Sequence, residues 1–333
     1  MFNPLNMVTP ANDLVRSYEN EDRDLANMIF RTTYSAGGTF SFSALLMPLY
    51  RPSVLPLAAM EMPDYTEISE VNLNRADKSY LAIGLRGDLH LRIADISAYY
   101  YNGYNKLPGI KLDMLRIPDG TENDSSVLYL SEEPYRMEML GGEMEGVAGK
   151  LGWRWQFSWH RPFDESMQEE HIPFPEFNGV AGVDFSISGA KVTIEYAGKK
   201  VINWVEPAVP PAMPGEGDLS QLALLPPVVA EAAVREQIGS FNRLFTYQVE
   251  RYYHMAGINI SPDDIGRTFS PEITATYNFT THEYLVRPAI SLTPYDRVKI
   301  RFGAEYWHGD KGSIFNYISD SLTSLWIGIR VDL

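Results

Sequence analysis

The sequence predicts an all-β protein, a transmembrane antiparallel up-and-down β-barrel, and three observations support this prediction. Apolar and polar residues alternate along about 13 segments, which is the pattern of strands with two different faces. The connections between these segments alternate between short turns and long loops. The chain of 333 residues has no uncharged apolar stretch of about 18 residues, which excludes a helical membrane protein.

Composition narrows the class further. The 43 acidic residues exceed the 28 lysines and arginines, and the net charge is −15, so nucleic acid is not an expected partner. Cysteine is absent, which excludes disulfides and thiolate metal sites. Twenty tyrosines, 15 phenylalanines and six tryptophans accompany this acidity, and such an aromatic, acidic chain suggests β architecture in an outer membrane.

The clearest strand is LGWRWQFSWH at residues 151–160. Trp153 and Trp155 lie on an apolar face, and Arg154 lies on the opposite, polar face. We expect the tryptophan face to contact lipid, because three tryptophans on one strand would otherwise need a deep core. The last segment, SLWIGIRVDL at residues 324–333, alternates in the same way.

The same template predicts 13 strands, with an ambiguous register in the fourth and the ninth. Their expected ranges are 25–35, 38–50, 79–87, 91–104, 134–146, 151–160, 179–188, 191–204, 239–254, 270–280, 284–293, 297–308 and 324–333.

Connection lengths place the two ends of these strands. Short turns are expected at 35–38, near Asp88, and at 147–149, 189–190 and 293–296, and long loops at 51–78, 105–133, 162–178, 205–238 and 309–321. Two connections break the rule, since 255–268 is long on the short side and Thr280 to Glu283 is tight on the long side. The layout predicts a single barrel domain over residues 1–333, with short periplasmic turns and long outer loops. Within loop 205–238, the segment 226–237 begins with proline and predicts a short helix, a surface cap or a lumen constriction.

The acidic charge is concentrated in four of these loops. Segments 61–77, 117–133, 163–178 and 206–236 together hold 20 acids and two bases, a balance of −18. Such loops would concentrate cations at a pore mouth or bind divalent ions beside lipopolysaccharide, and the plainer interpretation is a solvated loop surface.

Several segments resemble a porin-like family of Gram-negative outer-membrane barrels. They are Asn3-Pro4 with Thr9-Pro10 and Asp13, an acidic patch at 19–22, the prolines of 51–56, SYLAIGLRGDL, and EPYRMEMLGGEMEG followed by LGWRWQFSW. The resemblance implies an outer-membrane location and contact with outer-membrane lipid and lipopolysaccharide. It also implies an upstream strand, which fits the odd strand count. We therefore expect an N-terminally truncated chain, 14 or 16 strands in the full protein, and residues 1–23 as a loop before the first visible strand.

No catalytic motif appears, so neither an enzyme nor a cofactor is predicted. The metalloprotease, nucleophile-elbow, phosphate-loop and dinucleotide fingerprints are all missing. The six histidines are scattered without metal-ligand spacing, and no metal site is predicted.

The inward face is the predicted functional surface, because a charged side chain costs roughly 2–4 kcal/mol at mid-membrane on a lipid face. These charges either brace the wall as paired ladders or set the selectivity of a water-filled constriction. The lumen-facing candidates are Arg31, Arg86, Arg136, Arg154, Arg301, Arg330, Glu138, Asp184, Glu195, Glu272, Glu305 and Asp332.

The sequence is best interpreted as an outer-membrane porin-like channel for passive passage of small solutes or ions. Two alternatives stay open: a secreted soluble β-rich protein that binds glycans, and a closed structural barrel without transport. The sequence does not fix the oligomeric state or the solute.

Overall fold

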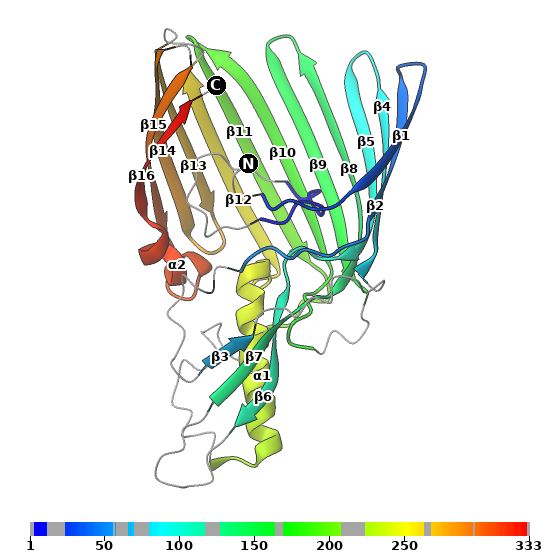
Figure 1. The fold of residues 1–333 in the computed structure, drawn as a ribbon, viewed down its shortest axis with the longest axis vertical. Coiled ribbons are helices and arrows are strands. Elements are labelled where there is room, and N and C mark those ends of the chain that lie inside the picture. Colours follow the sequence, from blue (N-terminus) through cyan, green and yellow to red (C-terminus); the bar gives the residue numbers. More distant parts are fainter. Residues whose placement is uncertain are drawn as a thin grey trace.

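A 13-stranded antiparallel sheet dominates the computed structural model, which describes residues 3–11, 24–55, 57, 66–69, 80–116, 127–163, 169–207, 224–262, 268–295 and 297–331 (Figure 1). Its strands are β1 (Phe30–Ala36), β2 (Phe40–Met47), β4 (Ala82–His90), β5 (Ala94–Tyr104), β8 (Arg136–Ala148), β9 (Leu151–Pro162), β10 (Glu176–Ile187), β11 (Ala190–Val201), β12 (Tyr252–Pro262), β13 (Phe269–Asn278), β14 (Glu283–Tyr295), β15 (Val298–His308) and β16 (Ser324–Val331).

Each strand of this sheet pairs with the next one along the chain, which is the up-and-down order. Twelve of the 13 predicted segments coincide with these strands, so the predicted all-β, antiparallel wall is confirmed. The ninth, 239–254, shares only residues 252–254 with β12, and the rest of β12 lies in the predicted connection 255–268. In the described part of the chain, β1 and β16 are each paired on one side only. Both run toward the end of the sheet that carries the short turns (Figure 1), so a strand lying between them would run opposite to both.

Tight turns join the strands at that end, as the sequence predicts. The turn between β10 and β11 has two residues, Ser188 with φ 50° and Gly189 with φ 79°, between the paired residues Ile187 and Ala190. Two consecutive positive φ angles define the type I′ turn, whose twist matches that of antiparallel strands. Glycine occupies this conformation without steric cost, which is why Gly-containing dipeptides mark these turns.

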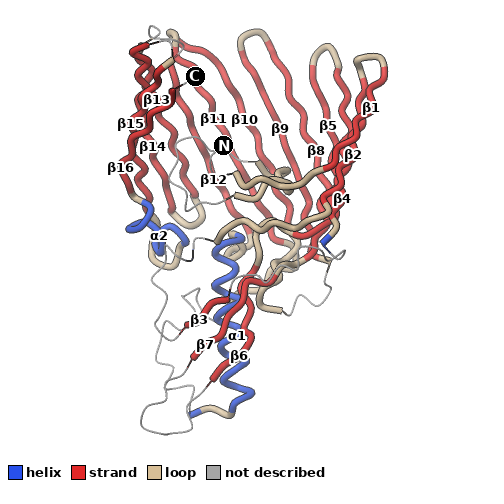
Figure 2. Tube along the Cα trace, in the orientation of Figure 1, coloured by secondary structure: helices blue, strands red, loops and turns tan. Residues whose placement is uncertain are grey.

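The long loops gather at the opposite end, where they carry structure of their own (Figure 2). Strands β3 (Thr66–Ser69), β7 (Val127–Glu133) and β6 (Gly109–Arg116) form a second sheet, and helix α1 (Pro227–Thr246) packs against β6. We call this unit the loop-side lobe. A short helix, α2 (Ile314–Leu322), precedes β16. The sequence did not predict β3, β6, β7 or α2.

Helix α1 corrects two expectations. The helix has 20 residues, whereas the sequence predicts a short helix at 226–237. It also occupies the first half of the strand predicted at 239–254. The physical reason is the spacing of its apolar residues, since Ala230, Val234, Ile238, Phe241 and Leu244 recur every three or four positions and are all buried. The last four of these form the core of the loop-side lobe together with leucines and an isoleucine of β6 and β7. No helix of the described residues is long and apolar enough to cross a membrane.

Candidate functional site

The large sheet has one apolar face that is strongly exposed. On β9, Trp155 is 64% and Phe157 is 63% exposed, and on β16 Leu325 is 88% exposed. These residues alternate with polar neighbours, and exposed Ile, Leu, Phe and Tyr side chains continue the same face over the other strands. A monomeric soluble protein rarely exposes an apolar patch of this extent. We call this surface the outer face.

The opposite, inner face carries an ion pair that spans three strands and whose carboxylate is buried. Arg154 of β9 contacts Glu195 of β11, and Glu195 is 1% exposed. Gly182 of β10 lies between them, and a Cβ placed there would be 3.0 Å from the Arg154 Nε. The missing side chain of Gly182 therefore leaves room for a charge pair to cross over the middle strand.

A second inner network is centred on Arg86 of β4. Its Nε lies 2.5 Å from Asp88 Oδ1, its NH2 lies 3.4 Å from Glu143 Oε1, and its guanidinium stacks on Tyr99 at 4.9 Å. Asp88 also accepts a hydrogen bond from Ser97 at 2.7 Å. Arg86 therefore contacts two carboxylates, Asp88 on its own strand and Glu143 on β8, two strands away, and these contacts stabilise the wall.

A third set occupies the last strands. Arg287 NH2 lies 2.7 Å from Glu305 Oε1, and Arg301 Nε donates to Ser291 Oγ at 2.9 Å. Asn259 donates to Glu272 Oε1 at 2.8 Å. The inner face of β13 to β15 is therefore polar and internally bonded in the same way as that of β4 to β11.

Nine of the 12 candidate residues lie on the inner face. Arg31 donates to inner Ser43, Asp184 faces Gly152, and Arg330 shares a face with Trp326, whose ring covers Gly303. The complete set is Arg31, Arg86, Arg154, Asp184, Glu195, Glu272, Arg301, Glu305 and Arg330. Asp332 lies outside the described residues.

Arg136 and Glu138 of β8 require a correction, because they lie on the outer face. Their strand neighbours Met137 and Met139 are 2% exposed and point inward. Strict alternation then places Arg136, Glu138 and Leu140 on the other side. Near the loop end of the strand, Glu138 pairs with Arg161 at 3.3 Å and Arg136 donates to Asn102 at 2.8 Å. The sequence pattern is misleading here because methionines occupy the inward positions.

Those methionines are covered by residues 3–11, which we call the inner strap. Met7 of the strap is 6% exposed and belongs to one apolar cluster with Met47, Tyr101, Met137 and Met139, all on the inner face. Figure 1 shows the strap running across the concave side of the sheet. The sequence predicts a loop at residues 1–23, and its described part, residues 3–11, lies on the inner face.

Hydrogen bonds fix the strap at both ends. His160 Nε2 lies 3.1 Å from the carbonyl oxygen of Pro4, and Val54 N donates to the carbonyl of Ala11 at 3.0 Å. Leu25 N donates to the carbonyl of Pro10 at 2.8 Å. The strap is therefore held by a side chain of the wall and by two main-chain N–H groups, one before β1 and one after β2.

A cluster of polar groups, the polar clamp, ties the wall to the end of α1. Glu176 lies 2.8 Å from Lys199 Nζ, accepts from Gln248 Nε2 at 2.8 Å and lies 3.5 Å from His160 Nδ1. Lys199 also donates to the carbonyl of Thr246 at 2.6 Å. Since His160 holds the strap as well, the wall, the strap and α1 meet at this clamp.

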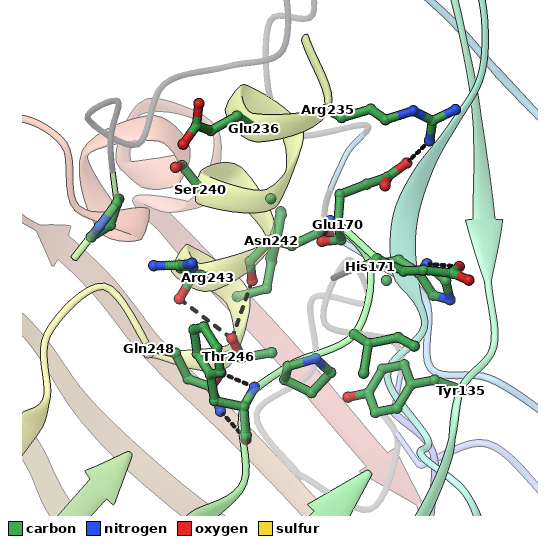
Figure 3. A pocket seen from close by; sticks show the side chains of 18 of the residues that line it. Tyr135, Glu170, His171, Arg235, Glu236, Ser240, Asn242, Arg243, Thr246 and Gln248 are labelled. Carbon is green, nitrogen blue, oxygen red and sulfur yellow. Dashed lines mark hydrogen bonds and ion pairs between the residues drawn. The ribbon is translucent and has the colours of Figure 1, made fainter. Parts of the chain in front are cut away.

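Two cavities lie on either side of the clamp. The inner cavity, about 260 Å³, is bounded by the strap, the inner ends of β8 to β11 and the residues after α1. The loop-side cavity, about 420 Å³, lies between α1, residues 169–174 and residues 205–207 (Figure 3). Both cavities are lined by a common set of residues, Leu107, Tyr135, Pro173, Phe174, Phe245, Thr246 and Gln248. Gln248 bonds the main chain of Phe174 at 2.7 and 2.8 Å, so this pair forms the partition.

Both arginines that line the loop-side cavity have polar partners. Arg235 lies 2.6 Å from Glu170 and 2.8 Å from Glu231, while Arg243 donates to the carbonyl of Val205 at 2.7 Å. Arg243 also stacks on Phe174 at 4.7 Å, and burial lowers the pKa of its guanidinium. Among the described residues, no group of three or more histidines and carboxylates could hold a metal ion.

The acidic loops are only partly visible. Residues 61–65, 70–77, 117–126, 164–168 and 208–223 lie outside the described part, and with them 11 of the 20 predicted loop acids. Of the acids that are described, Glu169 pairs with Lys111 at 3.2 Å, and Glu170 and Glu231 pair with Arg235.

Comparison with known proteins yields matches among solved structures, whereas no family model and no curated protein matches the chain. A porin refined at 1.8 Å resolution is 8% identical, with a TM-score of 0.43 over 92% of this chain and 91% of the porin. The Ralstonia pickettii toluene transporter TbuX is 9% identical, with a TM-score of 0.32 over 91% and 81% of the two chains. A ferric enterobactin receptor from Pseudomonas aeruginosa is 8% identical, with a TM-score of 0.31 over 90% and 53%.

Proposed function

We propose that this protein is a porin-like channel of the Gram-negative outer membrane that lets small solutes or ions cross passively. The observation that supports it best is the two-faced sheet: an exposed apolar outer face and an inner face of bonded charges. In a bilayer, the outer face contacts lipid and the charges line the lumen. Lipid and lipopolysaccharide are then its structural partners, and catalysis has no role.

The secreted glycan-binding alternative accounts poorly for the outer face. Side chains such as Trp155, Phe157 and Leu325 would be exposed to water at 63% or more. Each square ångström of apolar surface transferred from water contributes about 25 cal/mol, so a face of this size strongly favours lipid. Purification of the protein in soluble form without detergent would favour the glycan-binding alternative.

The closed structural barrel is favoured by a different observation. The inner strap lies within the concave side, and the inner charges pair with one another. Conductance separates the two functions directly, since a closed barrel passes no current.

Current measurements across planar bilayers that contain the protein test the proposed channel. The loops hold a balance of −18, while the described inner charges are largely paired, so cation preference should come from the mouth. We expect a weak cation preference at low salt that fades as the Debye length falls from about 30 Å at 0.01 M to about 3 Å at 1 M. A reversal potential favouring anions at low salt contradicts the charge argument, and the absence of any current contradicts the channel.

A further inference from the structure

We propose that the inner cavity is a binding site for a small uncharged solute that has an apolar face and one hydrogen-bonding group. This inference rests on the proposed channel, because the solute reaches the site through the lumen. The cavity of about 260 Å³ lies beside the strap at the loop end of the wall.

The site is built from seven separate segments of the chain. Residues 3–7 of the strap form one side, the inner ends of β8 to β11 form the floor, and residues 105–107, Tyr135 and 245–248 close the rest. Three of the lining side chains are almost fully covered, since Met137 is 2%, Tyr135 is 4% and Met7 is 6% exposed. Because these lining side chains are already held in place, they lose little conformational entropy when a ligand binds.

Apolar groups make up most of this lining. Met7 and Met137 face the cavity with Phe174, Phe245 and several prolines. Methionine side chains are flexible and polarisable, so they adapt to an apolar or ring-shaped ligand. Ligand sites combine such walls with a few fixed polar groups.

The polar groups of the floor select against charge. Glu176 and Lys199 lie 2.8 Å apart and neutralise each other, and both His160 nitrogens already have partners. A charged solute would enter without an unpaired opposite charge and would lose its hydration. Asn178 donates to Glu176 at 2.9 Å through one of its amide hydrogens, and its second N–H and its carbonyl oxygen can donate to or accept from the hydrogen-bonding group of a neutral ligand.

Calorimetric titration of the detergent-purified protein with benzyl alcohol, benzoate, benzylamine and glucose tests the site. These probes share a size range and differ in charge and polarity. We expect benzyl alcohol to bind at least tenfold more tightly than the three others. Equal affinity for all four, or no binding of benzyl alcohol, overturns the proposal.

Variants locate the site. Met137→Trp fills the cavity and should weaken benzyl alcohol binding at least tenfold, while Met144→Trp, on the outer face of the same strand, should leave it unchanged. Asn6→Trp fills the same cavity from the strap and does not alter the wall. This variant replaces Met137→Trp in the test if Met137→Trp does not give the heat-modifiable folded form. Undiminished binding by a folded cavity-filling variant contradicts the site.

Single-channel recordings on the same samples separate this inference from the proposed function. If the protein conducts current but does not bind benzyl alcohol, the proposed channel is supported and the proposed binding site is contradicted. Binding without current removes passive transport while the cavity remains a ligand site, though not one on a conduction path.

Discussion

Replacing Trp155 by arginine tests the orientation of the wall. Trp155 lies on the outer face of β9 and is 64% exposed. It is four residues from Leu151, where the strand leaves its turn. With a rise of about 3.3 Å per residue and a tilt of about 40°, Trp155 lies about 10 Å below the turn. The apolar band of such a wall is about 25 Å tall, so this position is close to mid-depth.

The expected cost follows from that depth. Arginine on a lipid face near the midplane destabilises a barrel by about 2–4 kcal/mol. Because each 1.4 kcal/mol is about a tenfold change in an equilibrium constant, Trp155→Arg should lower the folding equilibrium by roughly 30-fold to 700-fold. Urea unfolding from lipid vesicles, followed by the gel shift between folded and heat-denatured protein, measures this change.

The neighbouring residue supplies a matched control. Gln156 points inward and donates to Glu143 Oε2 at 3.2 Å, and its Oε1 has no hydrogen-bond partner in the described part of the protein. Gln156→Arg places a positive charge beside that carboxylate and removes the unpaired acceptor. We expect a change within about 1 kcal/mol, typical of a polar site without buried apolar packing. Equal losses for Trp155→Arg and Gln156→Arg would refute the assignment of the two faces.

Two further changes probe the inner face. Gly182→Leu should separate Arg154 from Glu195 and cost about 1–3 kcal/mol in urea unfolding, because the buried Glu195 would lose its contact with Arg154. Gly179→Leu, where no side chain lies within 4 Å of an added Cβ, is the control, and a similar loss in both argues against the pair. Met7→Asp places a charge in the apolar cluster under the strap and should raise single-channel conductance, whereas unchanged conductance shows that the strap does not narrow the lumen.

The strands could be predicted because their alternation is enforced by two different surroundings. On β9, every second residue belongs to the apolar outer face and every other one to the polar inner face, so the period is visible in the sequence itself. Segment 239–254 was ambiguous because one run contains the last turns of α1 and the first residues of β12. Helical spacing there is visible only when the window starts at Ala230.

The site was less accessible to sequence reasoning, for a physical reason. Sequence reasoning places Arg136 and Glu138 in the lumen because it treats charge as the mark of the inner face. The strap reverses that rule locally, since it covers the inner side with Met7 and so favours methionine at Met137 and Met139. The local pattern of β8 cannot indicate that the inner strap, more than 120 residues away in the chain, packs against it.

The arrangement of charge implies where selectivity arises. Arg86, Arg154 and Arg287 each lie next to a carboxylate, and the potential of such a pair falls off much faster with distance than that of a single charge. A solute in the middle of the lumen therefore meets little net field from these pairs. The unbalanced loop charge acts over a Debye length of about 8 Å at physiological salt, which confines its influence to the mouth. Selection by charge should thus occur at the mouth, and selection by size and polarity beside the strap.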